Sequence, residues 1–413
     1  MKIVIATAVY YPMINGVAVF SHNLAKGLVQ RGHEVMVLCP SQNGKNYLDV
    51  EDGVNVQRLK SIDVKIYPDQ INDVPRKKRL FYKHGFKVSV FPAHEIKRAL
   101  DEFCPDVVHV QVSDPIGLSV VSYARKKQIP VVTTEHNQPE VLTEPLKLPR
   151  LMRKPINALL YSYFRNRQNK SDFVTMPTKE AIDNLIFSSG HELKVPVAAI
   201  SNGVDLSNFK PGRAKREIYQ KYSISPDCQT VLYVGRLDPE KKVGLVIDAF
   251  YIANKSLPDL QMVVVGDGVD RVNLEKKVSK LGLKNVKFLG RVLAPDLYEL
   301  YRTGSLFATA SEIETQGIVL IEAAAVGLPL IAVDKGAVKE VCVDGENGFL
   351  CEPGNVHEIA EAMMKILSDK KLQESFSKQS LKIAGEHDFE KTLDRFINIY
   401  NRLVNNKQEK GPY

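Results

Sequence analysis

The sequence predicts an α/β protein made of two tandem domains, each built on a parallel β-sheet covered by helices. Its 413 residues suit two or three domains of ordinary size. Short apolar runs of strand length alternate with segments of helical spacing, which is typical of a parallel sheet with helices on both faces. This alternation starts twice along the chain, so two similar units are expected.

The strands of both series follow from apolar runs. The first series comprises Ile3–Ala6, Glu34–Cys39, Val107–Gln111, Val131–Thr134 and Phe173–Met176, with a helix at Ala18–Gln30. The second comprises Val231–Val234, Met262–Val265, Val286–Leu289, Leu306–Thr309 and Leu330–Val333. The segment between the two series contains sequences typical of turns and linkers, Asn202-Gly203 and Lys210-Pro211-Gly212. They predict a hinge within 196–212. We therefore expect domains at 1–200 and 201–404, with a last helix free to pack back on the first domain, and a disordered polar tail at 405–413.

The composition is that of a soluble globular protein. Hydrophobic residues make up 44% and charged residues 25%. The longest apolar runs are far shorter than the ~20 residues that span a bilayer. The N-terminus runs directly into a strand pattern, so no secretory signal is expected and the predicted location is cytoplasmic. Five cysteines without a Cys-x-x-Cys pair indicate neither a disulfide framework nor a zinc site.

The positive charge is unevenly distributed. The net charge is +8, and residues 1–200 hold 27 Lys and Arg against 19 Asp and Glu, so the whole excess lies in the first half. This asymmetry predicts that the first half meets an anionic partner, for which a nucleic acid and a membrane surface are the usual candidates.

Ligands of open parallel sheets bind beyond the carboxyl ends of the strands, so the loops after strands are the places to search. Arg236 and Lys241 both lie in the loop that directly follows Val231–Val234. An arginine offers a bidentate donor and a lysine a point charge, which together suit a diphosphate. The alternative is a solvated loop with ordinary surface charges.

A second candidate loop follows Leu306–Thr309. It holds Glu314, and the helix expected to begin at Gln316-Gly317 would present free backbone N–H groups to phosphate or sugar oxygens. The alternative is that Glu312 and Glu314 only complement the helix dipole. Glu322 argues against that alternative because it interrupts an apolar run, where an unpaired carboxylate would be costly; we expect it about two turns inside the helix.

These motifs resemble family 4 of the glycosyltransferases. The residues that carry the resemblance in the second half are Gly235-Arg236-Leu237, Pro239-Glu240-Lys241, Gly266-Asp267-Gly268, Leu289-Gly290-Arg291-Val292, and Glu314 with Glu322. In the first half they are Tyr11-Pro12, Asn15-Gly16-Val17, Arg31-Gly32-His33-Glu34-Val35, Pro105–His109 and Thr134-Glu135-His136, followed by Ser201–Asp205 at the junction. The resemblance covers nearly the whole chain and implies the GT-B fold, in which two Rossmann-like domains face each other across a cleft.

The resemblance implies roles for the residues of the second half. Arg236 and Lys241 would hold the donor diphosphate and offset charge on the leaving group. Glu322 would bind the ribose hydroxyls. Glu314 and the backbone at Gln316-Gly317 would contact the transferred sugar.

The resemblance also implies roles for three further residues. Gly16 would let the backbone approach the diphosphate closely, although Asn15 replaces a glycine that many relatives have there. Val292 would belong to the donor site. His136 matches the family's active-site histidine, which faces the sugar or the acceptor; the alternative is a packed histidine at a strand end. His109 is interpreted as structural.

The family's chemistry is a hexosyl transfer that retains the anomeric configuration. In it the leaving phosphate takes the acceptor proton on the same face, so Glu314 would position and stabilise charge rather than attack. The chain has no Asp-x-Asp, so no metal-bridged diphosphate is expected, and Arg236 and Lys241 would replace the metal. No cofactor is expected either. The nucleotide sugar is a substrate.

Two basic stretches in the first half indicate the acceptor. Residues 76–87 carry six Lys and Arg and residues 147–170 carry seven, neither with an acid, and aromatic and apolar residues alternate with them. That mixture suits a headgroup interface, although two amphipathic helices with solvated basic faces are the alternative. Pro12–Val17, His136–Glu140 and Glu314–Gly317 resemble the lipid-glycosylating branch, including diacylglycerol glucosyltransferases. The expected partners are thus an anionic membrane surface on the inner face of the cell membrane, a lipid acceptor, and UDP-glucose before GDP-mannose as donor.

Other function classes fit less well. A dinucleotide-dependent oxidoreductase is disfavoured because neither first loop has a Gly-x-Gly-x-x-Gly. A nonenzymatic sensor of sugar nucleotides and a transferase acting on soluble saccharides stay open as alternatives. Nucleic-acid binding is not expected, because the basic stretches contain no recognised module.

Overall fold

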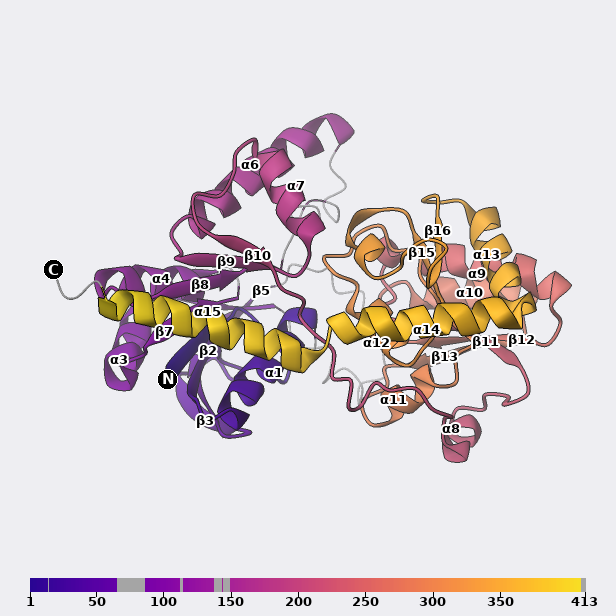
Figure 1. Cartoon of the computed structure of the whole chain (residues 1–413), viewed down its shortest axis with the longest axis horizontal. Coiled ribbons are helices and arrows are strands. Elements are labelled where there is room, and N and C mark those ends of the chain that lie inside the picture. The colour runs from indigo at the N-terminus through magenta and orange to yellow at the C-terminus, as the bar shows by residue number, and fades with distance from the viewer. Residues whose placement is uncertain (14, 65–85, 112–113, 137–142, 144–148, 410–413) are drawn as a thin grey trace. The chain divides into compact units, whose positions relative to one another are not determined.

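Two compact units make up the chain. The structure, a computed structural model, describes residues 1–13, 15–64, 86–111, 114–136, 143 and 149–409. Unit 1 consists of Met1–Ser201 with Thr392–Tyr413, and unit 2 consists of Asn202–Lys391. In Figure 1 unit 1 runs from indigo to magenta and is joined by the yellow helix of the C-terminal segment.

Unit 1 is built on an eight-stranded sheet in the order β10-β9-β8-β7-β1-β2-β4-β3, in which β3 alone is antiparallel to its neighbour. The sheet strands are β1 Lys2–Ala6, β2 Glu34–Pro40, β3 Tyr47–Glu51, β4 Val54–Leu59, β7 Val107–Val110, β8 Val131–Thr134, β9 Phe173–Met176 and β10 Val197–Ala199. A separate antiparallel pair is β5 Ser61–Val64 with β6 Phe86–Ser89. The helices are α1 Gly16–Gln30, α3 Ala93–Phe103, α4 Pro115–Lys126, α6 Arg150–Gln168, α7 Lys179–Ser189 and α15 Phe389–Glu409.

The sheet of unit 1 is buried on both faces, as the alternation along β1 shows. Ile3 and Ile5 pack in a cluster with α1 and α15, whereas Val4 and Ala6 pack in a cluster with α3 and α4. Successive residues of a strand point to opposite faces, so a continuous apolar run is what a doubly covered strand requires. Helices α6 and α7 cover β9 through a smaller cluster around Val174.

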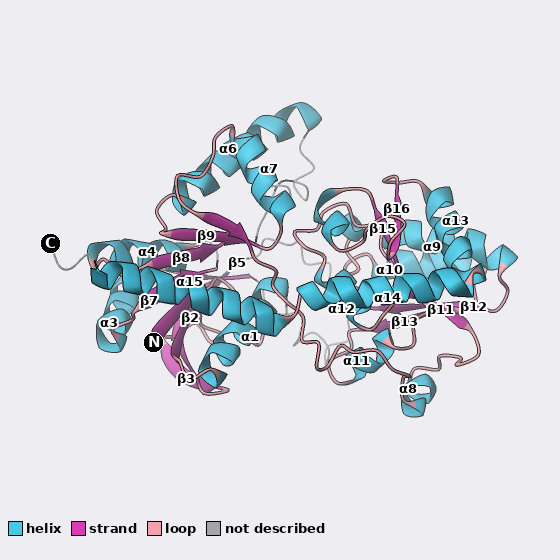
Figure 2. Cartoon of the chain, viewed as in Figure 1, coloured by secondary structure: helices cyan, strands magenta, loops and turns pink. Residues whose placement is uncertain are grey.

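Unit 2 repeats this plan with six parallel strands in the order β13-β12-β11-β14-β15-β16. The strands are β11 Gln229–Val234, β12 Leu260–Val265, β13 Val286–Gly290, β14 Leu306–Ala308, β15 Leu330–Val333 and β16 Gly348–Cys351. The helices are α8 Arg216–Lys221, α9 Val243–Ser256, α10 Arg271–Lys280, α11 Asp296–Tyr301, α12 Ile318–Ala325, α13 Val356–Ser368 and α14 Lys370–Glu386, with short 3₁₀ turns at Pro239–Lys241 and Gly336–Glu340. Helices and strands alternate along most of both units, apart from the consecutive strands β2 to β5 and the consecutive helices α13 to α15 (Figure 2).

The predicted α/β class with two parallel-sheet units is confirmed, and the unit boundary lies between Ser201 and Asn202. The prediction of a disordered tail is wrong for residues 405–409, because α15 continues through them to Glu409. Of the two basic stretches, residues 76–85 lie outside the described residues. Among the described residues, no helix is both long and apolar enough to cross a membrane.

Candidate functional site

The sheet order of unit 2 locates a candidate site. Strand β11 lies between β12 and β14, so the direction in which the chain winds reverses there. In open α/β sheets, ligands bind beyond the carboxyl ends of the two strands at such a switch point. The loops in question are 235–242 after β11 and 309–317 after β14, which are the two loops that the sequence analysis selected.

Close backbone contacts set the shape of the loop after β11. A Cβ atom at Gly266 would lie 1.8 Å from the carbonyl oxygen of Gly235, and one at Gly268 would lie 2.4 Å from that of Leu237. The backbone N–H of Leu237 also donates to the Asp267 carbonyl at 3.0 Å. Glycines are therefore required for the loops after β11 and β12 to close on each other, and the residues between these contacts are held in place.

The structure brings Lys241 and Glu314 into direct contact. The Lys241 Nζ lies 2.6 Å from Oε1 of Glu314, and the two side chains are only 15% and 18% exposed. This ion pair joins the loop after β11 to the loop after β14 across the switch point. The two residues therefore lie where one bound molecule can meet both.

Arg236 is held within its own loop. Its guanidinium forms ion pairs with Asp238 and, at 2.9 Å, with Oε1 of Glu240, and its side chain is half-exposed. The 2.9 Å contact is a charge-assisted hydrogen bond that keeps the guanidinium near the strand end. A diphosphate would have to replace these carboxylates or add to them.

Glu312 is a further carboxylate of the site that the sequence analysis assigned only to the helix dipole. It accepts from Lys242 and, at 2.7 Å, from Lys335. Burial raises the pKa of this carboxyl, but the hydrogen bonds and charges of the two lysines outweigh it and hold the pKa below its usual value. No local pattern could have identified Lys335, because it follows another strand.

The loop after β14 leads into α12. Gly317, the N-cap, has φ +77°, a left-handed conformation that favours glycine. No described side chain caps this helix. The Gln316 side chain is almost fully buried, and its Oε1 accepts from the backbone N–H of Asn202 at 3.1 Å, so it holds the loop to the start of unit 2.

Glu322 lies in the second turn of α12, slightly nearer the helix start than expected, because the helix begins at Ile318 rather than at Gln316-Gly317. The hydroxyl of Tyr301 donates to its Oε2 at 2.5 Å. Burial raises the pKa of this carboxyl to about 7, and the tyrosine hydrogen bond offsets only part of that effect. Val292, in the loop after β13, is partly buried and packs against the core under the same helix.

Unit 1 carries the two other predicted site residues. Gly16 is exposed and begins α1, directly after the N-cap Asn15, rather than lying within the preceding loop. His136 follows the carboxyl end of β8 and is 7% exposed. Burial lowers the pKa of His136 to about 3, so this imidazole is neutral at physiological pH.

A chain of buried hydrogen bonds leads from His136 to α15. His136 Nε2 lies 2.8 Å from Oε1 of Gln111, and Nε2 of Gln111 lies 3.3 Å from Nε2 of His109. The other ring nitrogen of His109, Nδ1, lies 2.6 Å from the Tyr400 hydroxyl. His109 is fully buried, as expected for a structural histidine, and burial, followed by the nearby His136, lowers its pKa to about 3.

This chain determines where the protons lie. In the orientation that the structure gives the Gln111 amide, its nitrogen donates to Nε2 of His109, which also lies 2.7 Å from the Thr134 hydroxyl oxygen, so Nε2 accepts and Nδ1 donates to Tyr400. The amide oxygen of Gln111 can only accept, so His136 carries its proton on Nε2 and leaves a lone pair on Nδ1.

We therefore expect ¹⁵N-resolved NMR of the histidine rings to show His136 as the Nε2–H tautomer, with no titration between about pH 5 and pH 8. Gln111→Leu removes the amide that selects the proton position, so the tautomer signals of His136 should become mixed. An Nδ1–H tautomer, or an imidazolium forming near pH 6.5, would contradict the assignment.

Gln111 and Tyr400 were not predicted as site residues from the sequence. Gln111 had a signal, because His109 and Gln111 are two residues apart at a strand end and therefore point to the same face. No local sequence signal indicated Tyr400, since it lies 291 residues from its partner His109 along the chain.

Family models match both halves of the chain. Residues 14–208 match the model described as Glycosyltransferase Family 4, and residues 214–383 match the model described as Glycosyl transferases group 1. The chain belongs to glycosyltransferase family 4. This confirms the resemblance, and with it the activity class of a glycosyltransferase.

Relatives in the family differ in the sugars and acceptors that their names state. An alpha-monoglucosyldiacylglycerol synthase of Acholeplasma laidlawii is 28% identical over 92% of both chains. A GDP-mannose-dependent alpha-mannosyltransferase of Mycobacterium tuberculosis is 25% identical over 90% of this chain and 89% of the relative. Among solved structures, HepE of Anabaena in complex with UDP and glucose superposes with a TM-score of 0.71 at 19% sequence identity. The superposition covers 97% of this chain and all of HepE, so the two proteins share a fold.

Proposed function

We propose that this glycosyltransferase moves a hexose from a nucleotide diphosphate sugar, UDP-glucose in the first place, to a lipid acceptor such as 1,2-diacylglycerol, with retention of anomeric configuration and without a metal ion. The observation that carries the proposal is the Lys241–Glu314 pair at the switch point of unit 2, flanked by Arg236. It combines cations for a diphosphate with a carboxylate for sugar hydroxyls in one place.

The donor would be held by the two loops and α12. Lys241 and Arg236 would bind the diphosphate, Gly16 would allow close approach to it, and Glu322 would accept hydrogen bonds from the ribose hydroxyls. Glu314 would then be released from Lys241 to the hydroxyls of the sugar, with the backbone at 316–317 beside it. The hydrophobic side chain of Val292 would line the same site.

In the transfer step, the acceptor hydroxyl oxygen bonds to the anomeric carbon as the bond from that carbon to the diphosphate breaks. The hydroxyl proton passes to the departing phosphate on the same face, so configuration is retained. Lys241 and Arg236 stabilise the negative charge that develops on the leaving group. His136, held neutral, would contact the sugar or acceptor through Nδ1 as a hydrogen-bond acceptor rather than as an acid.

Helix α6 supports a membrane-bound acceptor. Met152, Leu159 and Tyr163 recur at helical spacing on α6 and are 53%, 72% and 41% exposed, and Phe187 of α7 is 88% exposed. Arg153 and Lys154 lie between Met152 and Leu159 along α6, and Arg165 and Arg167 follow Tyr163. A helix with exposed apolar and cationic side chains lies well in an anionic headgroup layer. The protein would then act as a peripheral protein on the inner face of the cell membrane.

The test is transfer of radiolabelled glucose from UDP-glucose to diacylglycerol in vesicles of increasing anionic lipid content, with EDTA present. We expect activity and cosedimentation to rise with anionic lipid, to fall with salt and to survive EDTA. Leu159→Ser with Phe187→Ser should reduce vesicle binding, whereas Leu48→Ser, at a position on β3 that is 60% exposed, should not. Transfer only to soluble saccharides would overturn the lipid acceptor, and complete loss in EDTA restored only by a divalent ion would overturn metal independence.

A GDP-mannose-dependent mannosyltransferase is the second candidate, because relatives of that name match as much of the chain. Thermal shifts with UDP, GDP and their sugars distinguish the two, since a ligand at about 100 times its Kd stabilises by about 2.7 kcal/mol. Nucleotide binding without turnover on any acceptor would instead favour a sensor.

A further inference from the structure

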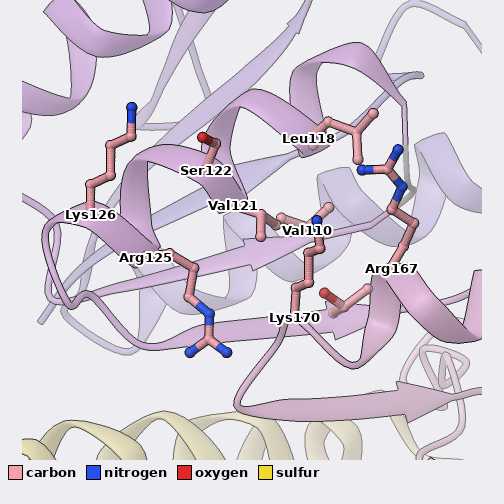
Figure 3. Close-up of a pocket in the computed structure, with 10 residues that line it drawn as sticks. Val110, Leu118, Val121, Ser122, Arg125, Lys126, Arg167 and Lys170 are labelled. Atoms are coloured by element: carbon pink, nitrogen blue, oxygen red, sulfur yellow. The ribbon is translucent and has the colours of Figure 1, made fainter.

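A basic pocket lies between α4 and α6 on the sheet face that α3 and α4 cover. Its volume is about 440 Å³, within the roughly 300–1,000 Å³ of small-molecule sites. The floor comes from β7 and β8 through Val110 and Thr133, and the α4 side from Leu118, Val121 and Ser122. Figure 3 shows this wall together with the cationic residues of α4, of the end of α6 and of the segment after it that line the pocket.

Four cations line the pocket: Arg125 and Lys126 at the end of α4, Arg167 in the last turn of α6, and Lys170 just after that helix. No acidic residue is among the lining residues that the structure describes. Asp172 pairs with Arg125 at 3.1 Å, while within the described part of the chain Lys126 and Lys170 form no ion pair. Like charges gathered at one cavity repel each other until an anion enters.

Two of the cations are already oriented. The Asp172 contact uses one N–H of Arg125 and leaves the others for a ligand. The Arg167 guanidinium lies 5.0 Å from the centroid of the Tyr163 ring, a cation–π contact that restrains it. Cations at helix C-termini also complement the helix dipole, but that role alone does not require a cavity with an apolar wall beside them.

The pocket is separate from the predicted transfer site. Arg125, Lys126 and Lys170 belong to segments that lead into the amino ends of β8 and β9, whereas Gln111 and His136 follow the carboxyl ends of β7 and β8. None of the described lining residues belongs to the two loops at the switch point of unit 2.

We infer that this pocket binds a phosphate ester on an apolar stem, at a site distinct from the donor diphosphate site. The four cations would take the phosphate, and Leu118 and Val121 would contact the stem. The ligand's source is either the headgroup of an anionic phospholipid or a small phosphate ester in solution. The site would exist whether or not the acceptor is a lipid.

The test measures binding to the full chain by calorimetry with three probes: glycerol phosphate, monomeric short-chain phosphatidylglycerol and the equivalent zwitterionic phosphatidylcholine. We expect saturable, salt-sensitive binding of at least one anionic probe. Binding of the phosphatidylglycerol alone identifies a lipid ligand, and equal binding of glycerol phosphate identifies a soluble one. No anionic binding tighter than about 10 mM, or equal binding of the zwitterionic lipid, would overturn the proposal.

Variants assign the binding to this pocket. Lys126→Gln with Lys170→Gln should weaken anion binding by about tenfold for each cation removed. Both lysines are exposed, so the double variant should fold and keep its UDP affinity. Lys127→Gln is the matched control: it removes the same charge at the next position but pairs with Asp101 outside the pocket, and should bind as the wild type does. An unchanged Kd in the double variant would overturn the site.

Discussion

Lys241→Ala is expected to lower kcat for glycosyl transfer by about 10²-fold to 10³-fold, the usual cost of removing one preorganised group that stabilises developing charge. Lys241 is held at the switch point by a 2.6 Å contact and is largely buried, so solvent screens its charge little. Because negative charge builds up on the diphosphate only as it leaves, the fold decrease in kcat should exceed the fold decrease in donor affinity. Steady-state kinetics with UDP-glucose and the acceptor measure kcat and the apparent donor affinity.

Glu314→Gln provides the complementary comparison. It removes the carboxylate that neutralises Lys241, so UDP affinity should increase while transfer slows, opposite to the effect of Lys241→Ala on affinity. Lys276→Ala, an exposed position on α10, serves as the control and should leave both quantities unchanged. Unchanged kcat in Lys241→Ala, or equal losses of UDP affinity in both site variants, would show that the pair does not hold the diphosphate.

Glu322→Gln is expected to weaken nucleotide binding by about tenfold to 100-fold above pH 7, since hydrogen bonds to a charged carboxylate contribute about 1.5–3 kcal/mol. Ribose hydroxyls donate to the ionised form. Because the free carboxyl has a pKa of about 7, wild-type affinity should rise with pH through that value and level off above it. In the glutamine variant this dependence should be absent. Calorimetry with UDP between about pH 6 and pH 8 measures it.

The thermal stability of Glu322→Gln shows whether weaker nucleotide binding results from loss of the fold. The pKa of Glu322 is raised in the folded state, so the folded chain binds more protons than the unfolded one between the usual value of 4.5 and about 7. Its contribution to the free energy of unfolding therefore falls as pH rises through that window. Glu322→Gln should not lower Tm at pH 8, so weaker binding there would reflect the site. A pH-independent UDP affinity in the wild type would contradict the ribose role.

The sequence predicted most strands because both sheets are covered on both faces. Ile3–Ala6 and Met262–Val265 are continuous apolar runs, and the structure places β1 and β12 there. The β3–β4 hairpin was missed, since β3 is largely exposed and lacks such a run. Its turn had a signal nonetheless: Asp52-Gly53, both with positive φ, is the dipeptide that two-residue hairpin loops favour.

The site was predictable where it follows from local sequence after a strand. Lys241 and Glu314 were selected in separate loops, and the structure joins them, because carboxyl ends of parallel neighbours meet at one edge of the sheet. Contacts between segments that are distant in the sequence could not be predicted from local sequence. The pairing of Lys335 with Glu312 depends on the order of the strands, which the sequence did not reveal.

Helix α15 has a consequence for the order of folding on the ribosome. Leu393, Phe396 and Tyr400 are buried in the core that Ile3 and Phe20 also form, so the core of unit 1 needs residues from both ends of the chain. Unit 2 is contiguous from Asn202 to Lys391. Although translated second, it is therefore the first unit whose core can close during synthesis. Unit 1, with its buried His109–Tyr400 bond, is completed only after α15 has emerged.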